Sequence, residues 1–203
     1  MTVTSKPGNG NKVHVYVDGT YAFTLYDEVW AGAGIAEGSE VSEDELASLR
    51  EEAGFRSAYE KGLTLLSSRA YATRELREKL RQKHGAAAAD RAIEKLASYG
   101  YLDDEAFAAD YARYLMERKH FDVRRIALEL RRKGVDGETA AKTLKTLDND
   151  PISRIIELLK TKYDGKLEEE KERKRLVNRL LRMGYTLHDI RAAFSSLDLT
   201  LPE

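Results

Sequence analysis

The feature that most constrains this chain is an apolar pattern that recurs about every 50 residues. Three segments, 73–96, 123–147 and 173–197, can be laid over one another, with one residue of slip inside the first. Four apolar columns then align: Leu76, Ile126 and Leu176; Leu80, Leu130 and Leu180; Ile93, Leu144 and Phe194; and Leu96, Leu147 and Leu197. Self-similarity at such a period is typical of stacked structural repeats. The pattern therefore predicts tandem repeats rather than one globule.

Each repeat is predicted to contain three helices. Two lie within the segment, and Gly134 and Gly184 follow the second column by four residues, where a helix-ending glycine is common. A further amphipathic helix precedes each segment, around Tyr59, Phe107 and Ile155. We therefore expect a mainly α-helical fold, an elongated and curved solenoid. The expected three-helix repeats span 55–102, 103–149 and 150–200.

Residues with capping chemistry mark several of the expected helix starts. Their side-chain oxygens accept hydrogen bonds from the free amides of a first helical turn. These residues are Ser42 with Glu45, Asp103, Asp122, and Thr186 with Asp189. Pro151 also suits a first turn, because the amide hydrogen that proline lacks has no partner there.

The N-terminal region has a different pattern. Val13–Val17 and Tyr21–Leu25 are β-branched and aromatic runs around Asp18-Gly19, which predicts a β-hairpin because glycine tolerates the positive φ of tight hairpin turns. An isolated hairpin is marginally stable in water, so it needs apolar contacts. The expected contacts are Tyr26, Val29 and Trp30.

Two further expectations complete this region. Residues 1–12 are rich in glycine, asparagine and lysine, and we expect them to be a disordered tail. A short helix should begin after Ser42 and end near Gly54, so that the region 13–54 holds a hairpin and short helices. Inside the following helix, Gly62 would allow another helix to approach closely.

Composition excludes several functional classes. The 203 residues include no cysteine, so disulfides, thiolate metal sites and cysteine nucleophiles are absent. No apolar stretch is long enough to span a membrane, and the first residues do not resemble a secretory signal, so we expect a cytoplasmic protein. The four histidines, at 14, 84, 120 and 188, lack metal-ligand spacing, and Asp103–Glu105 suits a helix start. We expect no enzyme, no metal and no cofactor.

The net charge of −1 conceals an uneven distribution. Residues 1–57 hold four basic and ten acidic residues, and the rest of the chain has an excess of five positive charges. Many basic residues lie beside the apolar columns of the middle helices, which predicts a basic surface that could contact a polyanion or an acidic protein. This basic set is Arg74, Arg77, Arg81, Arg124, Arg125, Arg131, Arg132, Lys133, Lys174, Arg175, Arg179 and Arg182. The alternative interpretation is an ordinary solvated helix face with local ion pairs.

Tyrosine is abundant, with 11 residues. Those at apolar helix or turn positions are expected to be core residues rather than stacking platforms for bases. They are Tyr59, Tyr99, Tyr101, Tyr111 and Tyr114.

Three stretches resemble the signature of the bacterial RecX regulatory proteins. They run from Leu63 through Thr73 and Glu75 to Leu80, from Leu96 through Gly100 and Asp103 to Ala108, and from Arg125 through Glu129 to Val135. The resemblance covers residues 58–136 closely and the third repeat more loosely. Two departures are Lys119–Asp122, where the family often has a glycine, and a charged insert from Asp164 to Lys174.

The resemblance implies a monomeric, non-enzymatic modulator of the RecA recombinase that acts in homologous recombination and SOS control. Such proteins bind the RecA–DNA filament, block its extension or promote its disassembly, and inhibit the ATPase, strand-exchange and co-protease activities. The basic set would contact acidic RecA surface or the phosphates of single- and double-stranded DNA, weakly and with strong salt dependence. Two alternatives stay open: a helix-turn-helix-like DNA-binding protein that acts without RecA, and a structural adaptor with no DNA role.

Overall fold

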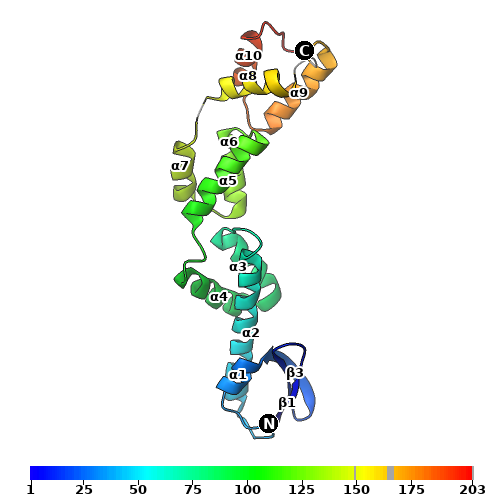
Figure 1. Cartoon of the computed structure of the whole chain (residues 1–203), viewed down its shortest axis with the longest axis vertical. Coiled ribbons are helices and arrows are strands. Elements are labelled where there is room, and N and C mark those ends of the chain that lie inside the picture. The colour runs from blue at the N-terminus through cyan, green and yellow to red at the C-terminus, as the bar shows by residue number, and fades with distance from the viewer. Residues whose placement is uncertain (149, 164–166, 203) are drawn as a thin grey trace. The chain divides into compact units, whose positions relative to one another are not determined.

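Figure 1 shows a computed structural model of the chain, which describes residues 1–148, 150–163 and 167–202. The chain forms two compact units, Met1–Asp103 and Asp104–Glu203. The predicted mainly helical, tandem three-helix architecture is confirmed, and the curvature of the whole chain stays a prediction. Residues 164–166 of the charged insert lie outside the described residues, as does Asn149 before Pro151.

The first unit begins with a three-stranded antiparallel sheet in the order β1 (Val3–Pro7), β2 (Lys12–Val17), β3 (Thr20–Tyr26). The predicted hairpin is therefore present as β2 and β3. The predicted disordered tail at residues 1–12 is wrong, because β1 forms within it and Val3 is completely buried. The β1 sequence offers one buried valine among polar residues, and such a strand becomes stable only through long-range pairing with β2 and with Ser39, whose carbonyl accepts from the Val3 amide.

Two helices follow the sheet, α1 (Asp27–Gly32) and α2 (Glu43–Leu66). The predicted Ser42–Glu45 capping box is confirmed at the start of α2. The predicted end near Gly54 is wrong, because α2 is 24 residues long and runs without a break to Leu66. A glycine inside a helix costs about 1 kcal/mol, and burial of apolar side chains against the sheet before Gly54 and in the first repeat after it exceeds that cost.

The C-terminal half of α2 forms the first three-helix repeat with α3 (Thr73–His84) and α4 (Ala86–Ser98). The aligned residues Leu76, Leu80 and Ile93 are all buried, as predicted. Gly62 allows α2 and α4 to approach closely, because a Cβ atom at Gly62 would lie 2.6 Å from Leu96 Cδ1. The close approach expected at this glycine is confirmed.

The second unit contains the other two repeats. Its helices are α5 (Asp104–Lys119), α6 (Val123–Lys133), α7 (Gly137–Lys145), α8 (Pro151–Lys162), α9 (Glu170–Arg182) and α10 (Leu187–Ser195). The predicted caps at Asp122, Pro151 and Thr186 are confirmed, and Gly134 ends α6 with φ of +87°. The middle-helix residues Ile126 and Leu130 are fully buried.

Three of the five tyrosines that were expected in the core are exposed. Tyr99, Tyr101 and Tyr114 retain 58%, 53% and 46% of their accessible surface, so the expectation is wrong for them. Tyr59 and Tyr111 are half-buried. A tyrosine at an apolar helical position can leave its ring at the surface, because its hydroxyl is stable in water. Among the described residues, no helix has both the length and the apolar character needed to cross a bilayer.

Candidate partner-binding surface

The positive charge of the repeats is concentrated in their middle helices. Helix α3 holds five Lys and Arg residues against two acidic residues, α6 holds five against one, and α9 holds six against two. The third helix of each repeat is nearly balanced, with two basic against two acidic residues in α4, two against one in α7 and one against one in α10. The basic set therefore follows one position in the repeat rather than the protein surface in general.

In the first unit, α3 presents arginines in two different states. Arg77 is half-buried and its Nε lies 3.2 Å from Asp90 Oδ1 on α4, so it serves the packing of the repeat. Arg74 and Arg81 are exposed and have no acidic partner in the described part of the chain. These two side chains are available to a partner.

On α6, most of the predicted residues are engaged within the unit. Arg125 and Arg132 both pair with Glu129, at 2.6 and 3.1 Å, and Lys133 lies over the Tyr111 ring. Arg131 is exposed and pairs with no acidic side chain among residues 104–148, 150–163 and 167–202. Arg124 takes part in a junction described below.

On α9, Arg175 pairs with Glu172 one turn earlier, and Arg179 lies 5.9 Å from the centre of the Tyr163 ring. Lys174 and Arg182 are exposed, and Arg182 has no acidic partner in the described part of this unit. Arg74, Arg81, Arg131 and Arg182 are therefore the basic residues that are most available, and we call them the four free arginines.

Two leucines are exposed among these arginines. Leu128 lies between Arg124 and Arg131 on α6 and keeps 40% of its surface, and Leu181 precedes Arg182 on α9 and keeps 38%. An apolar side chain contributes little to a contact with phosphates, whereas apolar groups surrounded by arginine are typical of protein interfaces. The surface is therefore mixed in character rather than purely electrostatic.

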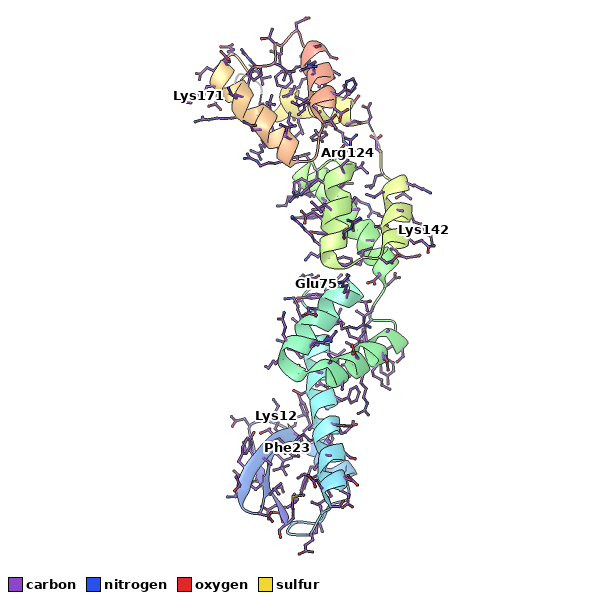
Figure 2. All side chains as sticks on the ribbon, turned by 180° about the vertical axis from the view of Figure 1, so that it is seen from behind. Lys12, Phe23, Glu75, Arg124, Lys142 and Lys171 are labelled. Atoms are coloured by element: carbon purple, nitrogen blue, oxygen red, sulfur yellow. The ribbon has the colours of Figure 1, made fainter. Side chains whose placement is uncertain are left out.

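A buried ionic junction links the second and third repeats inside the second unit. Asp122, 1% exposed, caps α6 through the Arg124 amide, and its other oxygen lies 3.2 Å from an Arg154 nitrogen on α8. The Arg124 guanidinium lies 3.3 Å from Asp189 at the start of α10, and Figure 2 shows Arg124 at this end of α6. Asp122 and Arg154 compensate each other where both side chains are largely buried, and an unpaired charge there would be costly. The Arg124–Asp189 pair lies at the edge of this site, because the Arg124 side chain is 61% exposed.

Hydrogen bonds to backbone carbonyls and close backbone packing also stabilise this junction. The Asp122 amide donates to the Met183 carbonyl at 2.9 Å, and the Tyr185 hydroxyl donates to the His120 carbonyl at 3.1 Å. Gly184, with φ of +101°, lies against Arg125 so closely that an added Cβ would be 2.7 Å from the Arg125 Cβ. The end of α9 therefore abuts the start of α6.

Electrostatics at the junction favour the charged carboxylate and the neutral imidazole. Burial raises the pKa of Asp189, but hydrogen bonds from Thr186 and Arg124 outweigh it, so the pKa lies below the ordinary value of 3.8. Burial, together with the positive charge of Lys162, lowers the pKa of His120, whose Nε2 accepts a hydrogen bond from Lys162 at 2.8 Å. His120 has φ of +56°, a left-handed conformation that favours glycine.

The sequence did not predict this junction as an interaction site. Asp122 and Asp189 were recognised as helix caps, and their second role depends on partners 32 and 65 residues away. Arg154 and Tyr185 carry no local signal, because Arg154 lies on an ordinary amphipathic helix and Tyr185 lies in the short turn between α9 and α10. Only the compact alignment of two repeats in space brings these side chains together.

Duplex reading by a helix-turn-helix pair finds little support in the geometry. Reading of duplex DNA by a helix-turn-helix pair uses its second helix, and here that helix is α4, α7 or α10, in which basic and acidic residues are nearly balanced. Among the described residues there is no group of three or more histidine, aspartate or glutamate side chains that could hold a metal ion. The arrangement is instead suited to contact with a large partner.

Comparison with known proteins places these features in a family. Models of the first and second three-helix domains of RecX match residues 58–96 and 103–144. The regulatory protein RecX of Caldanaerobacter subterraneus is 27% identical over 199 residues, which cover 96% of this chain and 98% of that protein. The regulatory protein RecX of Trichlorobacter lovleyi is 34% identical over 142 residues, which cover 67% of this chain and 92% of that protein.

Solved structures agree on the fold. A crystal structure of regulatory protein RecX has a TM-score of 0.63 at 20% identity and covers 95% of this chain and 97% of that one. A second, of RecX from Lactobacillus salivarius, has a TM-score of 0.58 at 21% identity and covers 71% of this chain and 97% of that one. The tandem three-helix repeats, the matched domains and the Trichlorobacter relative together show that the chain belongs to the RecX family of regulatory proteins.

Proposed function

We propose that this chain binds the RecA–DNA filament and inhibits RecA through the exposed faces of α3, α6 and α9. Membership of the RecX family supports RecA as the partner. The observation that carries the proposal is the recurrence of exposed arginines, without described acidic partners, on the middle helix of each repeat: Arg74, Arg81, Arg131 and Arg182. Arg77 and Arg125, by contrast, pair with acidic side chains inside the repeats.

A repeating ligand suits a repeating partner. A helical filament presents the same surface at each protomer, so basic faces from successive repeats can contact successive copies. Joining several weak contacts in one chain raises the overall affinity far above that of one contact, provided that the spacing allows simultaneous binding. The arginines can contact acidic protein surface or DNA phosphates, and both kinds of contact weaken with salt.

The exposed leucines favour a protein surface as part of the site. Leu128 lies between arginines on α6, and Leu181 lies beside one on α9. A protein partner would bury these side chains, whereas a nucleic-acid backbone would leave them exposed to solvent. Inhibition would then follow from occupation of a RecA surface that an incoming protomer or a second DNA strand also needs. The contact would block extension of the filament or promote its disassembly.

The test is RecA ATPase on single-stranded DNA with this protein added. The test variant carries Arg74→Glu, Arg81→Glu, Arg131→Glu and Arg182→Glu. The control variant carries four reversals at exposed basic residues without described partners elsewhere on the repeats: Arg118→Glu, Lys145→Glu, Lys160→Glu and Arg191→Glu. We expect the control to inhibit like the wild type and the test variant to need at least about tenfold more protein, since four salt-sensitive contacts are reversed.

The outcomes separate the alternatives. Equal inhibition by both folded variants would remove the middle helices from the mechanism. Inhibition by substoichiometric protein as a slow decline in turnover supports capping of filament ends. A strong preference for one duplex sequence in gel-shift titration without RecA would support the DNA-binding alternative, and binding to a partner equally at low and high salt would support the adaptor.

A further inference from the structure

The N-terminal sheet has one apolar face and one face of aromatic, basic and hydroxyl side chains. Side chains alternate along each strand, so the register assigns every residue to a face. The apolar face packs on α2 through Val3, Val15 and Leu25, and Figure 2 shows Phe23 on this side, between the sheet and α2. The open face carries Thr4, Lys6, Lys12, His14, Tyr16, Tyr21, Thr24 and Tyr26.

A β-bulge places the most exposed ring on the open face. The pairing shifts between Val15 and Tyr16, so that Val15 lies opposite Phe23 whereas Tyr16 lies opposite Tyr21. Strict alternation from Phe23 would have turned Tyr21 toward α2. Instead Tyr21 is 55% exposed, and its hydroxyl lies 3.1 Å from Thr24 Oγ1 on the same face. Bulges commonly redirect a side chain in this way.

The rings on this face form a connected group. The centre of the Tyr21 ring lies 6.0 Å from both His14 and Tyr16, in edge-to-face geometry. The His14 Nδ1 lies 2.7 Å from Thr24 Oγ1, which fixes the imidazole in the group. Because the neighbouring rings and the threonine hold it, Tyr21 is presented to solvent with restricted freedom, and little entropy is lost when a flat ligand stacks on it.

The charge of the face is opposite to that of its surroundings. Residues 1–57 have ten acidic side chains against four basic ones, yet the strand residues of the open face include no acidic residue and two of the four basic ones, Lys6 and Lys12. Acidic side chains approach the face at its Tyr26 end, where Glu28 and Glu60 lie near the tyrosine. Their ammonium groups lie 4.9 Å from the Tyr16 ring centre and 5.3 Å from the Tyr26 ring centre. Cations and aromatic rings therefore lie close together on this face. Such an arrangement suits single-stranded nucleic acid, in which bases can stack on rings and phosphates can contact cations.

We propose that the open face of the β1–β3 sheet binds single-stranded nucleic acid. Tyr21 stacks on an unpaired base, and Lys6 and Lys12 contact the neighbouring phosphates. Duplex nucleic acid fits less well, because its bases are already stacked and its grooves hide the ring faces. This site goes beyond the proposed function, since it lies on the N-terminal sheet and does not depend on the four free arginines.

The test measures binding of the full chain to fluorescently labelled oligothymidine of about 20 nucleotides, long enough for one such site. An abasic chain of the same length is the second probe. Tyr21→Ala removes the ring, with Tyr99→Ala, another exposed tyrosine of the first unit, as its control. We expect Tyr21→Ala to weaken binding to oligothymidine about tenfold, the typical loss of one stacked base, and to leave abasic binding unchanged.

The lysines are tested by the salt dependence of the same binding. A variant with Lys6→Glu and Lys12→Glu should reduce the slope of log affinity against log salt by about 1.4, at about 0.7 for each phosphate contact. The control variant, Lys61→Glu with Lys145→Glu, reverses two exposed lysines away from the face and should keep the wild-type slope. Each measurement is repeated in the variant that lacks the four free arginines, so that the sheet is judged separately from the repeats.

Two results would overturn the proposal. In one, Tyr21→Ala, shown to be folded by circular dichroism, binds oligothymidine as the wild type does or loses affinity equally for the abasic chain. In the other, polyglutamate displaces oligothymidine as effectively as the abasic chain does, and the lysine variant keeps the wild-type slope of log affinity against log salt. That result would indicate that the face binds acidic polymers in general. Loss of oligothymidine binding with RecA inhibition intact supports the sheet site and leaves the proposed function standing.

Discussion

At the scale of single residues, Gly184 shows most directly how the second unit depends on one missing atom. Its φ of +101° is a conformation that side chains rarely adopt, and the Arg125 backbone nitrogen would lie 2.9 Å from an added Cβ. Backbone atoms cannot rotate away as the end of a long side chain can. The glycine is therefore required for both conformation and space.

We predict that Gly184→Ala lowers the free energy of unfolding by about 2–4 kcal/mol, the sum of a backbone strain and an overpacking cost. Gly100→Ala is the matched control, because Gly100 has φ of +74° and no atom within 4 Å of an added Cβ. It should cost about 1 kcal/mol from strain alone. Urea unfolding measures both, and equal losses would show that space at the junction is not limiting.

The buried carboxylate of Asp122 is the second residue on which the junction depends. We predict that Asp122→Ala costs about 3–5 kcal/mol in the free energy of unfolding, because Arg154 is left buried without its partner. Asp136→Ala is the control, since Asp136 caps α7 at an exposed position and its loss should cost about 1 kcal/mol. A cost for Asp122→Ala no greater than that of the control would mean that capping is its whole contribution.

At the scale of elements, periodicity predicted the helices of the repeats, because a 3.6-residue pattern records which face is buried. The starts at Ser42, Asp122 and Thr186 were also predictable, since capping depends on neighbours two or three residues away. The extent of α2 and the existence of β1 were not predictable. Both are decided by tertiary contacts, with the sheet and the first repeat for α2 and with β2 for β1.

The candidate site was predictable to a similar degree. The sequence identified the basic column, but it could not separate Arg131, which is free, from Arg132, which is paired with Glu129. That distinction depends on rotation around the helix and on acidic neighbours. The bulge that exposes Tyr21 likewise has no sequence signal beyond the hairpin itself.

The exposed leucines give a prediction at this scale. Leu128→Ser with Leu181→Ser should weaken inhibition of RecA ATPase about tenfold, because two apolar side chains no longer become buried on binding. Affinity for DNA alone, measured by fluorescence anisotropy, should be unchanged. Leu187→Ser, at an exposed leucine on α10, is the control and should inhibit normally. Unchanged inhibition by the double variant would indicate that phosphates rather than protein contact α6 and α9.

At the scale of the whole molecule, the chain is two compact units, each with its own buried cores. A loss at the ionic junction should therefore remain local. We predict that Asp122→Ala increases amide hydrogen exchange in peptides from α6, α8, α9 and α10 and leaves exchange in α2, α3 and α4 unchanged. Mass spectrometry of the exchanged peptides measures this. Equal increases in both units would show that the chain unfolds as one cooperative body.

Helix α2 has a consequence for any attempt to divide this protein. Its first half carries Leu46, Leu49 and Ala53 into the core beneath the sheet, and its second half carries Ala58 into the first repeat. A fragment that starts at the first repeat would cut through the continuous helix α2. A fragment that keeps all of α2 but omits the strands would expose the apolar face of its first half to water, and such a surface is prone to self-association. Truncated forms of this protein should therefore keep the strands, the Ser42 cap and the whole of α2 together.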